Sequence, residues 1–210
     1  MGTAEFPLIR DRSQLFDRAA VVGTPSPVPR SPGLYAWFFD EAPPGIDLTG
    51  CYSASGLSLL YIGISPREPP ANGKPASRST LRHRLRTHYA GNAEGSTLRK
   101  TLGCLLADRL GIELRRVGSG NRRTFTNRGE QELDSWMGEH ALVAWMETDR
   151  PWELELTILR SGLRLPLNVR DNPSLELTTV VQRARRRWTE HSNGLPILAD
   201  NGGPRRRSGP

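Results

Sequence analysis

Two aromatic-rich stretches, GLYAWFF at residues 33–39 and LLYIGI at residues 59–64, are the strongest fold signal in this sequence. Aromatic and branched apolar side chains in short runs are typical of β-strands. Proline and glycine at positions 43–45 mark a loop between the two runs. We therefore expect two neighbouring strands joined by a long loop.

Helical signals follow the second strand. Residues 66–79 are polar and rich in proline and glycine, which predicts a loop, and Ser79 can cap the helix that comes next. Leucines at helical spacing predict a second helix over residues 96–110. The expected elements are helices over 13–22, 80–89, 96–110, 130–140, 152–161 and 178–191, and strands over 33–39, 59–64, 112–117, 124–126 and 141–146.

This order of elements indicates an α+β fold with a small, mostly antiparallel sheet flanked by helices. We divide the chain into an N-terminal arm with a proline-rich connector (1–30), a catalytic domain (31–177), a basic C-terminal helix (178–192) and a tail (193–210). The composition of the tail cannot support a core, so we expect it to be disordered.

The formal charge of +7 is concentrated near the C-terminus. Residues 183–210 hold seven arginines against Glu190 and Asp200, a net of +5, which leaves about +2 for the rest. An uneven basic distribution favours a polyanion partner such as nucleic acid. The excess of arginine over lysine can equally reflect the base composition of the source genome. A second basic stretch contains Arg78, Arg82, Arg84, Arg86, Arg99 and Lys100.

Several classes of protein are disfavoured by the composition. Two cysteines, Cys51 and Cys104, give neither a disulfide framework nor a zinc-site pattern. No segment has the length of a signal peptide's apolar region or of a membrane span. We expect a soluble, cytoplasmic protein without a membrane partner.

The polar side chains that could carry chemistry are spread along the chain. Tyr35 and Tyr61 sit in the two expected strands, and Arg84 and His88 share one face of a helix. Phosphodiester hydrolysis needs a proton acceptor, a cation for the phosphate and usually a metal ion. Glu153 or Glu155 and Asn168 could complete such a set. Spacing alone does not single these residues out from other polar residues of the chain.

Five motifs in order resemble the GIY-YIG nuclease superfamily. Gly33-Leu34-Tyr35 and Tyr61-Ile62-Gly63 are similar to the paired strand motifs that name the family. The separation between them exceeds that of compact members, which implies an inserted loop over about residues 40–58. The later motifs are Arg84-Leu85-Arg86-Thr87-His88, Leu154-Glu155-Leu156-Thr157-Ile158-Leu159 and Pro166-Leu167-Asn168.

The resemblance implies an endonuclease that hydrolyses DNA, with duplex DNA as the expected partner. Tyr61 would act as general base on the attacking water or position it, supported by Tyr35. Arg84 would bind the scissile phosphate, and His88 would orient the nucleophile or relay a proton. Glu155 would bind one Mg²⁺ (or Mn²⁺), largely through waters. Asn168 would brace the site.

The sequence departs from the family pattern at two places. Many relatives have a lysine directly after the second motif, where this chain has Ile64, so Arg82 or Arg86 is a candidate replacement. The helix over residues 130–140 has no counterpart in the common pattern. We expect Trp136, Trp145 and Trp152 to serve packing, and the further nucleic-acid contacts to come from a clamp of Arg183, Arg185, Arg186 and Arg187.

Other functions remain open at this point. The fold can serve as a catalytically silent nucleic-acid-binding module, or it can be recruited to small-molecule chemistry. The joint presence of Tyr61, Arg84, Glu155 and Asn168 argues against a silent module. One active site that cuts duplex DNA must act twice or pair up, so a homodimer on the substrate is a further expectation.

Overall fold

The computed structural model describes residues 14–72, 77–170, 172 and 174–201. A four-stranded antiparallel sheet has the strand order β2-β3-β1-β6, and a separate two-stranded antiparallel sheet joins β4 and β5. The strands are β1 (Gly33–Phe39), β2 (Ser53–Ala54), β3 (Leu57–Ser65), β4 (Arg115–Val117), β5 (Arg122–Thr124) and β6 (Ala141–Glu147). The helices are α1 (Arg18–Val22), α2 (Leu81–Ala90), α3 (Thr97–Leu110), α4 (Thr126–His140), α5 (Pro151–Arg160) and α6 (Leu175–Gly194). The predicted α+β class and antiparallel sheet are confirmed.

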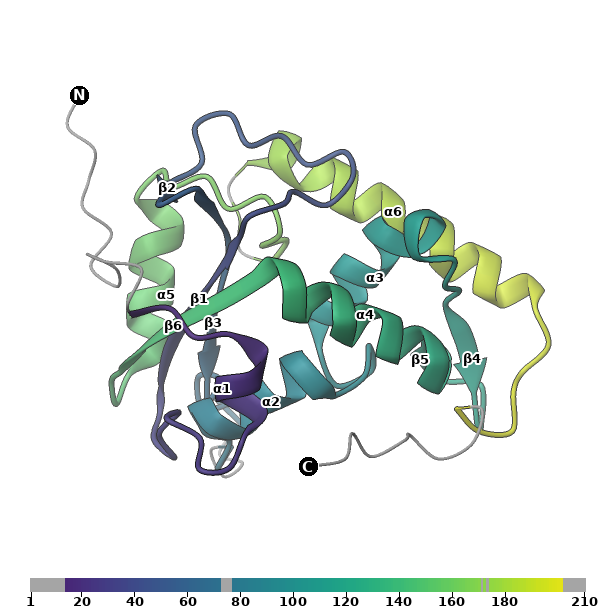
Figure 1. Cartoon of the computed structure of the whole chain (residues 1–210), viewed down its shortest axis with the longest axis horizontal. Helices are drawn as coiled ribbons and strands as arrows, with labels where there is room; N and C mark the ends of the chain where they lie inside the picture. Colours follow the sequence, from purple (N-terminus) through teal and green to yellow (C-terminus); the bar gives the residue numbers. More distant parts are fainter. Residues whose placement is uncertain (1–13, 73–76, 171, 173, 202–210) are drawn as a thin grey trace.

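Strand β1 forms the centre of the sheet and is buried at every position. Side chains of a strand alternate between the two faces of a sheet. Trp37 and Phe39 pack with α2, α3 and α4, whereas Leu34 and Phe38 pack with Ile158 of α5. Helices therefore cover both faces, with α5 on one side and the larger helical layer on the other (Figure 1). Burial on both faces explains why GLYAWFF is a continuous apolar run rather than an alternating one.

Gly33 permits the close approach of α2 to this sheet. A Cβ atom added there would lie 2.3 Å from the Met146 carbonyl oxygen of β6 and 2.6 Å from Cδ1 of Leu81. Real Cβ atoms do not approach other heavy atoms so closely, so a larger residue would force β1 away from β6 and displace the Leu81 side chain. The first glycine of the strand motif thus permits close pairing with β6 and close packing of Leu81, the first residue of α2.

Helix α4 is tied to α3 by a buried ion-pair network. The Arg99 side chain is fully buried and donates to the Glu130 carboxylate at 2.7 Å and to Asp134 at 2.7 Å. Glu130 also accepts from the backbone N–H groups of Ala93 and Phe125. Because a buried charge without a partner is costly, this network fixes α4 against α3 and the α2–α3 loop. The helix that the common pattern left unassigned therefore has a structural role.

The C-terminal part differs from its expected description. Helix α6 begins at Leu175, before the expected boundary at residue 178, and packs along α3 with Val181 and Trp188 buried (Figure 1). Leu198 then pairs with Val117 of β4, and the Asn201 side chain accepts from the Thr124 hydroxyl. The prediction of a disordered tail is therefore wrong up to residue 201, because backbone pairing with β4 orders this segment. Residues 202–210 lie outside the described residues.

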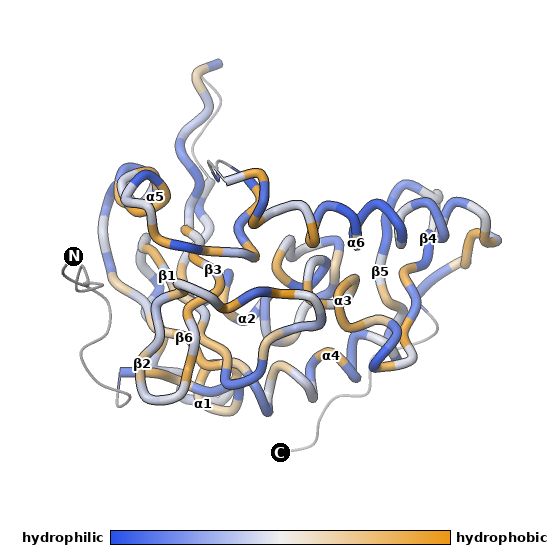
Figure 2. The backbone as a smooth tube through the Cα atoms, turned by 90° about the horizontal axis from the view of Figure 1, so that it is seen from above, coloured by the Kyte–Doolittle hydropathy of each residue, from blue (hydrophilic) through white to orange (hydrophobic). Residues whose placement is uncertain are grey.

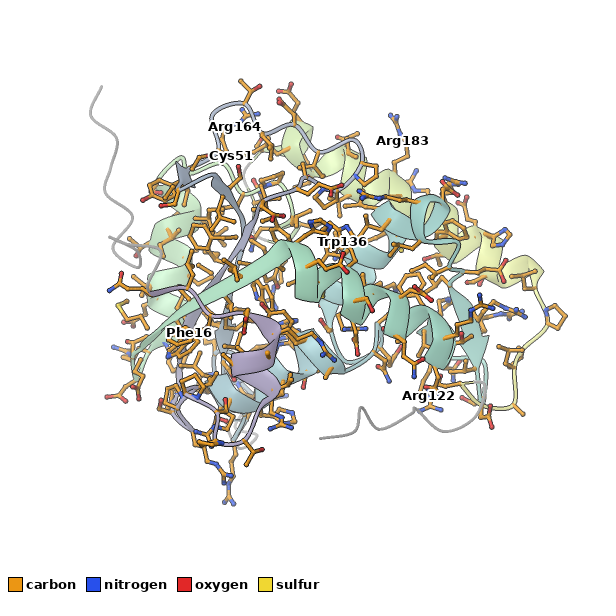
Figure 3. All side chains as sticks on the ribbon, viewed as in Figure 1. Phe16, Cys51, Arg122, Trp136, Arg164 and Arg183 are labelled. Carbon is orange, nitrogen blue, oxygen red and sulfur yellow. The ribbon has the colours of Figure 1, made fainter. Side chains whose placement is uncertain are left out.

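The described part of the N-terminal arm also packs on the domain. Phe16, labelled in Figure 3, pairs with Val143 of β6 through two backbone hydrogen bonds of 2.9 Å. Its ring stacks on Trp145 with 4.4 Å between the ring centroids. Val21 and Val28 belong to the main apolar core. Residues 16–30 are thus packed as part of the folded domain. None of the described helices is long and apolar enough to span a bilayer.

One predicted strand is partly wrong. The stretch 124–126 was expected to be extended, but β5 ends at Thr124 and α4 begins at Thr126. The Thr124 hydroxyl accepts from the Thr126 backbone N–H at 3.2 Å, which turns the chain into the helix. Such a side-chain bond competes locally with a strand, since it offers the backbone another partner.

Candidate active site

The two motif tyrosines come from paired strands. Tyr35 of β1 lies opposite Gly63 of β3 in the register, and Trp37 lies opposite Tyr61. The Tyr35 side chain crosses over Gly63, where an added Cβ atom would lie 2.5 Å from the phenol oxygen. The glycine of the second motif is therefore required by the side chain of the first.

Tyr35 is held by a line of hydrogen bonds behind the site. Its hydroxyl lies 2.8 Å from Nε2 of His88 and accepts from Nε of Arg84 at 3.3 Å. The Nδ1 atom of His88 lies 2.6 Å from the hydroxyl of Ser96, which also caps α3 by accepting from the Arg99 backbone N–H. A neutral His88 with its proton on Nδ1 satisfies each of these bonds, with Tyr35 donating to Nε2.

His88 is completely buried, so its role differs from that of a group in contact with water. Burial, followed by the positive charges of Arg84 and Arg99, lowers the pKa of His88 well below 6.5. The imidazole therefore stays neutral near pH 7. It contacts Tyr35 rather than the solvent-facing part of the site, which makes it a positioning residue for Tyr35.

Arg84 projects from α2 towards the Tyr35 hydroxyl. Its Nε atom donates to Tyr35 and its Nη1 atom to the Gly95 carbonyl at 2.9 Å. Among the residues that the structure describes, Arg84 forms no ion pair. A guanidinium offers five donors, so this arrangement leaves capacity for an anion.

Asn168 is a backbone brace. Its carbonyl oxygen accepts from the Ile62 N–H and its amide donates to the Ile62 carbonyl, both at 2.9 Å. Ile62 follows Tyr61 directly in β3, so this pair of bonds fixes the strand on which Tyr61 stands. The bracing function implied by the resemblance agrees with this geometry.

These groups open onto one cavity of about 440 Å³, which we call the site cavity. Its wall includes Tyr35, Tyr61, Arg84, Glu155 and Asn168. Five of the six predicted catalytic side chains thus meet at one place, and the sixth, His88, lies behind Tyr35. Such convergence of separated polar groups in a pocket of this size is typical of a ligand or substrate site.

Glu155 and Glu153 lie on different faces of α5. Glu155 is half-buried and lines the site cavity, whereas Glu153 is exposed and pairs with Arg150 at 2.8 Å. Of these two neighbouring carboxylates, only Glu155 lies on the wall of the site cavity.

The charges around Tyr61 set its acidity. Burial raises the pKa of the Tyr61 phenol, and the negative charge of Glu155 raises it further, while Arg84, Arg185 and Arg67 oppose this. The phenol is therefore protonated near neutral pH without further cations. Three guanidinium groups close enough to lower the pKa mark the cavity as a place where negative charge is stabilised.

The arginines predicted to contact nucleic acid lie in different surroundings in the structure. The Arg82 guanidinium donates to the carbonyls of Val28 and Ser26 and does not line the site cavity, so its position does not support a replacement of the family lysine. Arg86 of α2 is exposed. Of the helix α6 arginines, Arg183 and Arg186 are exposed, Arg187 pairs with Asp108 at 2.7 Å, and Arg185 turns inward to the cavity.

Two cavity residues, Arg67 and Trp152, were not predicted as site residues, and Arg185 was predicted only as a nucleic-acid contact of the C-terminal helix. Arg67 lies just after β3 and lines the cavity, close to where many relatives carry their lysine. Arg185 reaches the same wall from α6 and donates to the Thr97 carbonyl at 3.2 Å and to the Thr101 hydroxyl. Trp152 precedes Glu155 by one helical turn, and this i, i+3 spacing is a signal that could have placed it at the site.

The comparison with protein families agrees with this geometry. The family model described as GIY-YIG catalytic domain matches residues 33–187. The chain belongs to the GIY-YIG family. The match spans both strand motifs, Glu155, Asn168 and most of the described α6, and it identifies the chain with a class of nuclease domains. No curated protein and no solved structure matched the chain.

The cavity fits a single hard divalent ion held mainly by water and substrate oxygens. Within residues 14–72, 77–170, 172 and 174–201, no group of three or more His, Cys, Asp or Glu side chains converges as a metal cage. Mg²⁺ keeps several waters and binds through one or two carboxylates together with phosphate oxygens, which one Glu beside an anion site can provide. Zinc prefers three or four nitrogen and sulfur ligands, so the side chains present do not suit it.

Proposed function

We propose that the GIY-YIG protein is a metal-dependent endonuclease that hydrolyses phosphodiester bonds in DNA. The observation that carries this proposal is the meeting of Tyr61, Arg84 and Glu155 on the wall of one cavity. These three groups come from β3, α2 and α5, and only the folded chain brings them together.

Arg84 would bind the scissile phosphate. Its Nε atom is committed to Tyr35 and one Nη atom to Gly95, which fixes the plane of the guanidinium. A fixed, always-ionised fork of donors stabilises the negative charge that develops on the phosphate, without reorganisation during the reaction. Arg67 and Arg185 add positive charge on the same wall.

Tyr61 would take the proton of the attacking water or hold that water in place. Its pKa is raised by burial, so ionisation requires compensating positive charge around the phenol. Arg84, Arg185 and Arg67 supply part of it. Tyr35 and His88 would hold the Arg84 guanidinium in position without contacting the substrate phosphate.

Glu155 would hold one divalent ion, Mg²⁺ or Mn²⁺. Such an ion, when bound, neutralises phosphate charge and lowers the pKa of a coordinated water. The positive charge would also offset the effect by which Glu155 raises the pKa of Tyr61. Asn168 would keep Tyr61 in place by fixing the backbone of its neighbour Ile62.

The DNA partner would extend over α6. The residues of this helix are mostly hydrophilic (Figure 2), and Arg183 points outward from it (Figure 3). Arg183 and Arg186 are exposed, and Arg86 is exposed on α2. Such side chains would bind the phosphate backbone without reading sequence, which gives salt-sensitive affinity.

The test is incubation of the purified protein with supercoiled plasmid in Mg²⁺, in Mn²⁺ and in EDTA. We expect nicking or linearisation with either ion and none in EDTA. Glu155→Ala and Arg84→Ala should each abolish cleavage.

Glu153→Ala is the matched control, because Glu153 lies on the same helix but pairs with Arg150 outside the cavity. It should cut like the parent protein. Undiminished cutting by Glu155→Ala and Arg84→Ala would refute the site, and cutting in EDTA would refute the metal.

A further inference from the structure

Trp152 stands beside the proposed metal-binding carboxylate. It precedes Glu155 by three residues on α5, both side chains line the site cavity, and the indole is half-buried. Leu156 follows on the same wall and leaves 41% of its surface exposed. An aromatic and an aliphatic side chain thus form an apolar rim next to the reacting groups.

The other tryptophans are used for packing. Trp37, Trp136 and Trp188 are buried in apolar clusters, and Trp145 stacks on Phe16. Within the described part of the chain, Trp152 belongs to none of the three apolar clusters and pairs with no other aromatic ring. The expectation that Trp152 serves packing therefore has no support among the described contacts.

The side chains that line the cavity are of two kinds. Arg84, Arg67 and Arg185 supply positive charge, which suits a phosphate, whereas Trp152 and Leu156 offer apolar surface, which a phosphate cannot use. A volume of about 440 Å³ falls in the range of pockets that enclose whole organic ligands. A nucleotide has both parts, a charged phosphate and a flat base with an apolar face.

We propose that Trp152 is a stacking platform for the base of the nucleotide next to the scissile phosphate, with Leu156 extending that surface. The inference rests on the nuclease function proposed above and names its substrate more closely. A base inside a duplex is already stacked on its neighbours, so this nucleotide must be unpaired or flipped out of the helix. The substrate class is DNA that presents an unstacked nucleotide at the cleavage position.

The test compares two single-stranded DNA probes of equal charge in EDTA, so that no metal-dependent cleavage occurs. One probe is an oligothymidylate of about 20 nucleotides, and the other has the same length and phosphates but abasic tetrahydrofuran sugars. Stacking on an aromatic side chain is sequence-tolerant but needs a base. Fluorescence anisotropy gives the dissociation constant of each probe.

The parent protein should bind oligothymidylate more tightly than the abasic probe. Trp152→Ala should weaken oligothymidylate binding by about tenfold and leave abasic binding unchanged, whereas Trp152→Phe should retain most of the difference. Trp145→Phe is the matched control, since Trp145 stacks on Phe16 outside the cavity, and it should change neither constant.

Two outcomes would overturn the inference in distinguishable ways. Equal binding of the two probes by the parent, or equal weakening of both by Trp152→Ala, would dismiss base stacking and leave the nuclease proposal standing. Failure of the parent to bind either probe would count against both proposals.

Discussion

Arg84 and Arg99 lie on consecutive helices and are joined through Tyr35 and His88, but their surroundings differ. Arg99 is fully buried, and its guanidinium is surrounded by Glu130, Asp134 and the His88 carbonyl. Arg84 is half-buried and faces the site cavity, with one bond to Tyr35 and one to Gly95. In the sequence, a family motif marks Arg84, whereas nothing marks Arg99 as buried and paired.

An arginine side chain therefore serves structure at position 99 and is suited to chemistry at position 84. Two carboxylates neutralise Arg99, so it has no capacity for a further anion and holds α3 and α4 together. Arg84 has neutral partners that orient it without cancelling its charge. A charge that is held in place but left uncompensated is suited to bind a phosphate.

The largest effect is expected on stability, when the ion-pair network around Arg99 is broken. Glu130→Ala leaves Arg99 buried with one of its two carboxylate partners removed, which should cost about 3–5 kcal/mol of unfolding free energy. Urea unfolding followed by circular dichroism measures the loss. A loss below about 1 kcal/mol would mean that the network is not what fixes α4.

The next largest effect is expected from Gly63→Ala, which should lower the cleavage rate by displacing the Tyr35 side chain. The new Cβ would meet the Tyr35 hydroxyl, so the phenol and its bond to Arg84 must shift. Displacement of a catalytic group by about 1 Å can cost about 100-fold in rate. Single-turnover cleavage with Mg²⁺ measures the effect. Gly194→Ala is the control, because an added Cβ atom at Gly194 would meet no other atom within 4 Å, and this variant should cut normally. Gly56→Ala is unsuitable as a control, because the positive φ of 77° at Gly56 would be strained in alanine.

His88 should make stability depend on pH. Its pKa is lowered by burial and by Arg84 and Arg99, so below about pH 6.5 the unfolded chain takes up a proton that the folded chain does not. Its contribution to stability is therefore complete above pH 6.5 and declines as the pH falls. Between pH 7 and pH 5.5 the decline should be about 1 kcal/mol, since one pH unit corresponds to at most about 1.4 kcal/mol.

The measurement is urea unfolding at both pH values for the parent and for His88→Gln. The variant is less stable overall but should lack this part of the pH dependence. An identical pH dependence in the two proteins would show that His88 is protonated in the fold, which would contradict the hydrogen-bond arrangement around Tyr35.

The smallest effect is expected on α6, where exposed arginines resemble neither Arg84 nor Arg99. Arg183→Ala with Arg186→Ala should weaken DNA binding a few-fold and reduce the slope of log Kd against log salt by about 0.9 for each lost phosphate contact. Arg187→Ala is the control, because Asp108 already occupies that guanidinium. An unchanged slope in the double variant would remove α6 from the DNA-binding surface.

The strand pair, the helix with Arg84 and the order of elements were predictable because their patterns are local. Runs such as GLYAWFF and the leucines of α3 carry their periodicity in the sequence. The brace by Asn168 and the covering of Gly63 by Tyr35 are explained only by the strand register.

Other features depend on contacts between distant segments, and these were not predictable. Arg82 donates to carbonyls of the proline-rich connector, Arg185 turns from α6 into the cavity, and Leu198 pairs with β4. Each of these contacts depends on which surface a side chain meets after folding. Nothing local in the sequence distinguishes Arg82 or Arg185 from an exposed arginine. The family motifs identified the site, while the supporting network around Arg99 carried no motif.

The most direct test of the difference between Arg84 and Arg99 is single-turnover cleavage by Arg84→Ala at saturating protein with Mg²⁺, measured together with its thermal unfolding. Arg128→Ala is the matched control, because Arg128 is an exposed arginine of α4 that does not line the site cavity. We expect a rate about 100- to 1000-fold below the parent for Arg84→Ala, an unfolding temperature close to the parent's, and nearly normal cleavage by Arg128→Ala. An Arg84→Ala protein that cuts within about threefold of the parent rate would contradict this expectation.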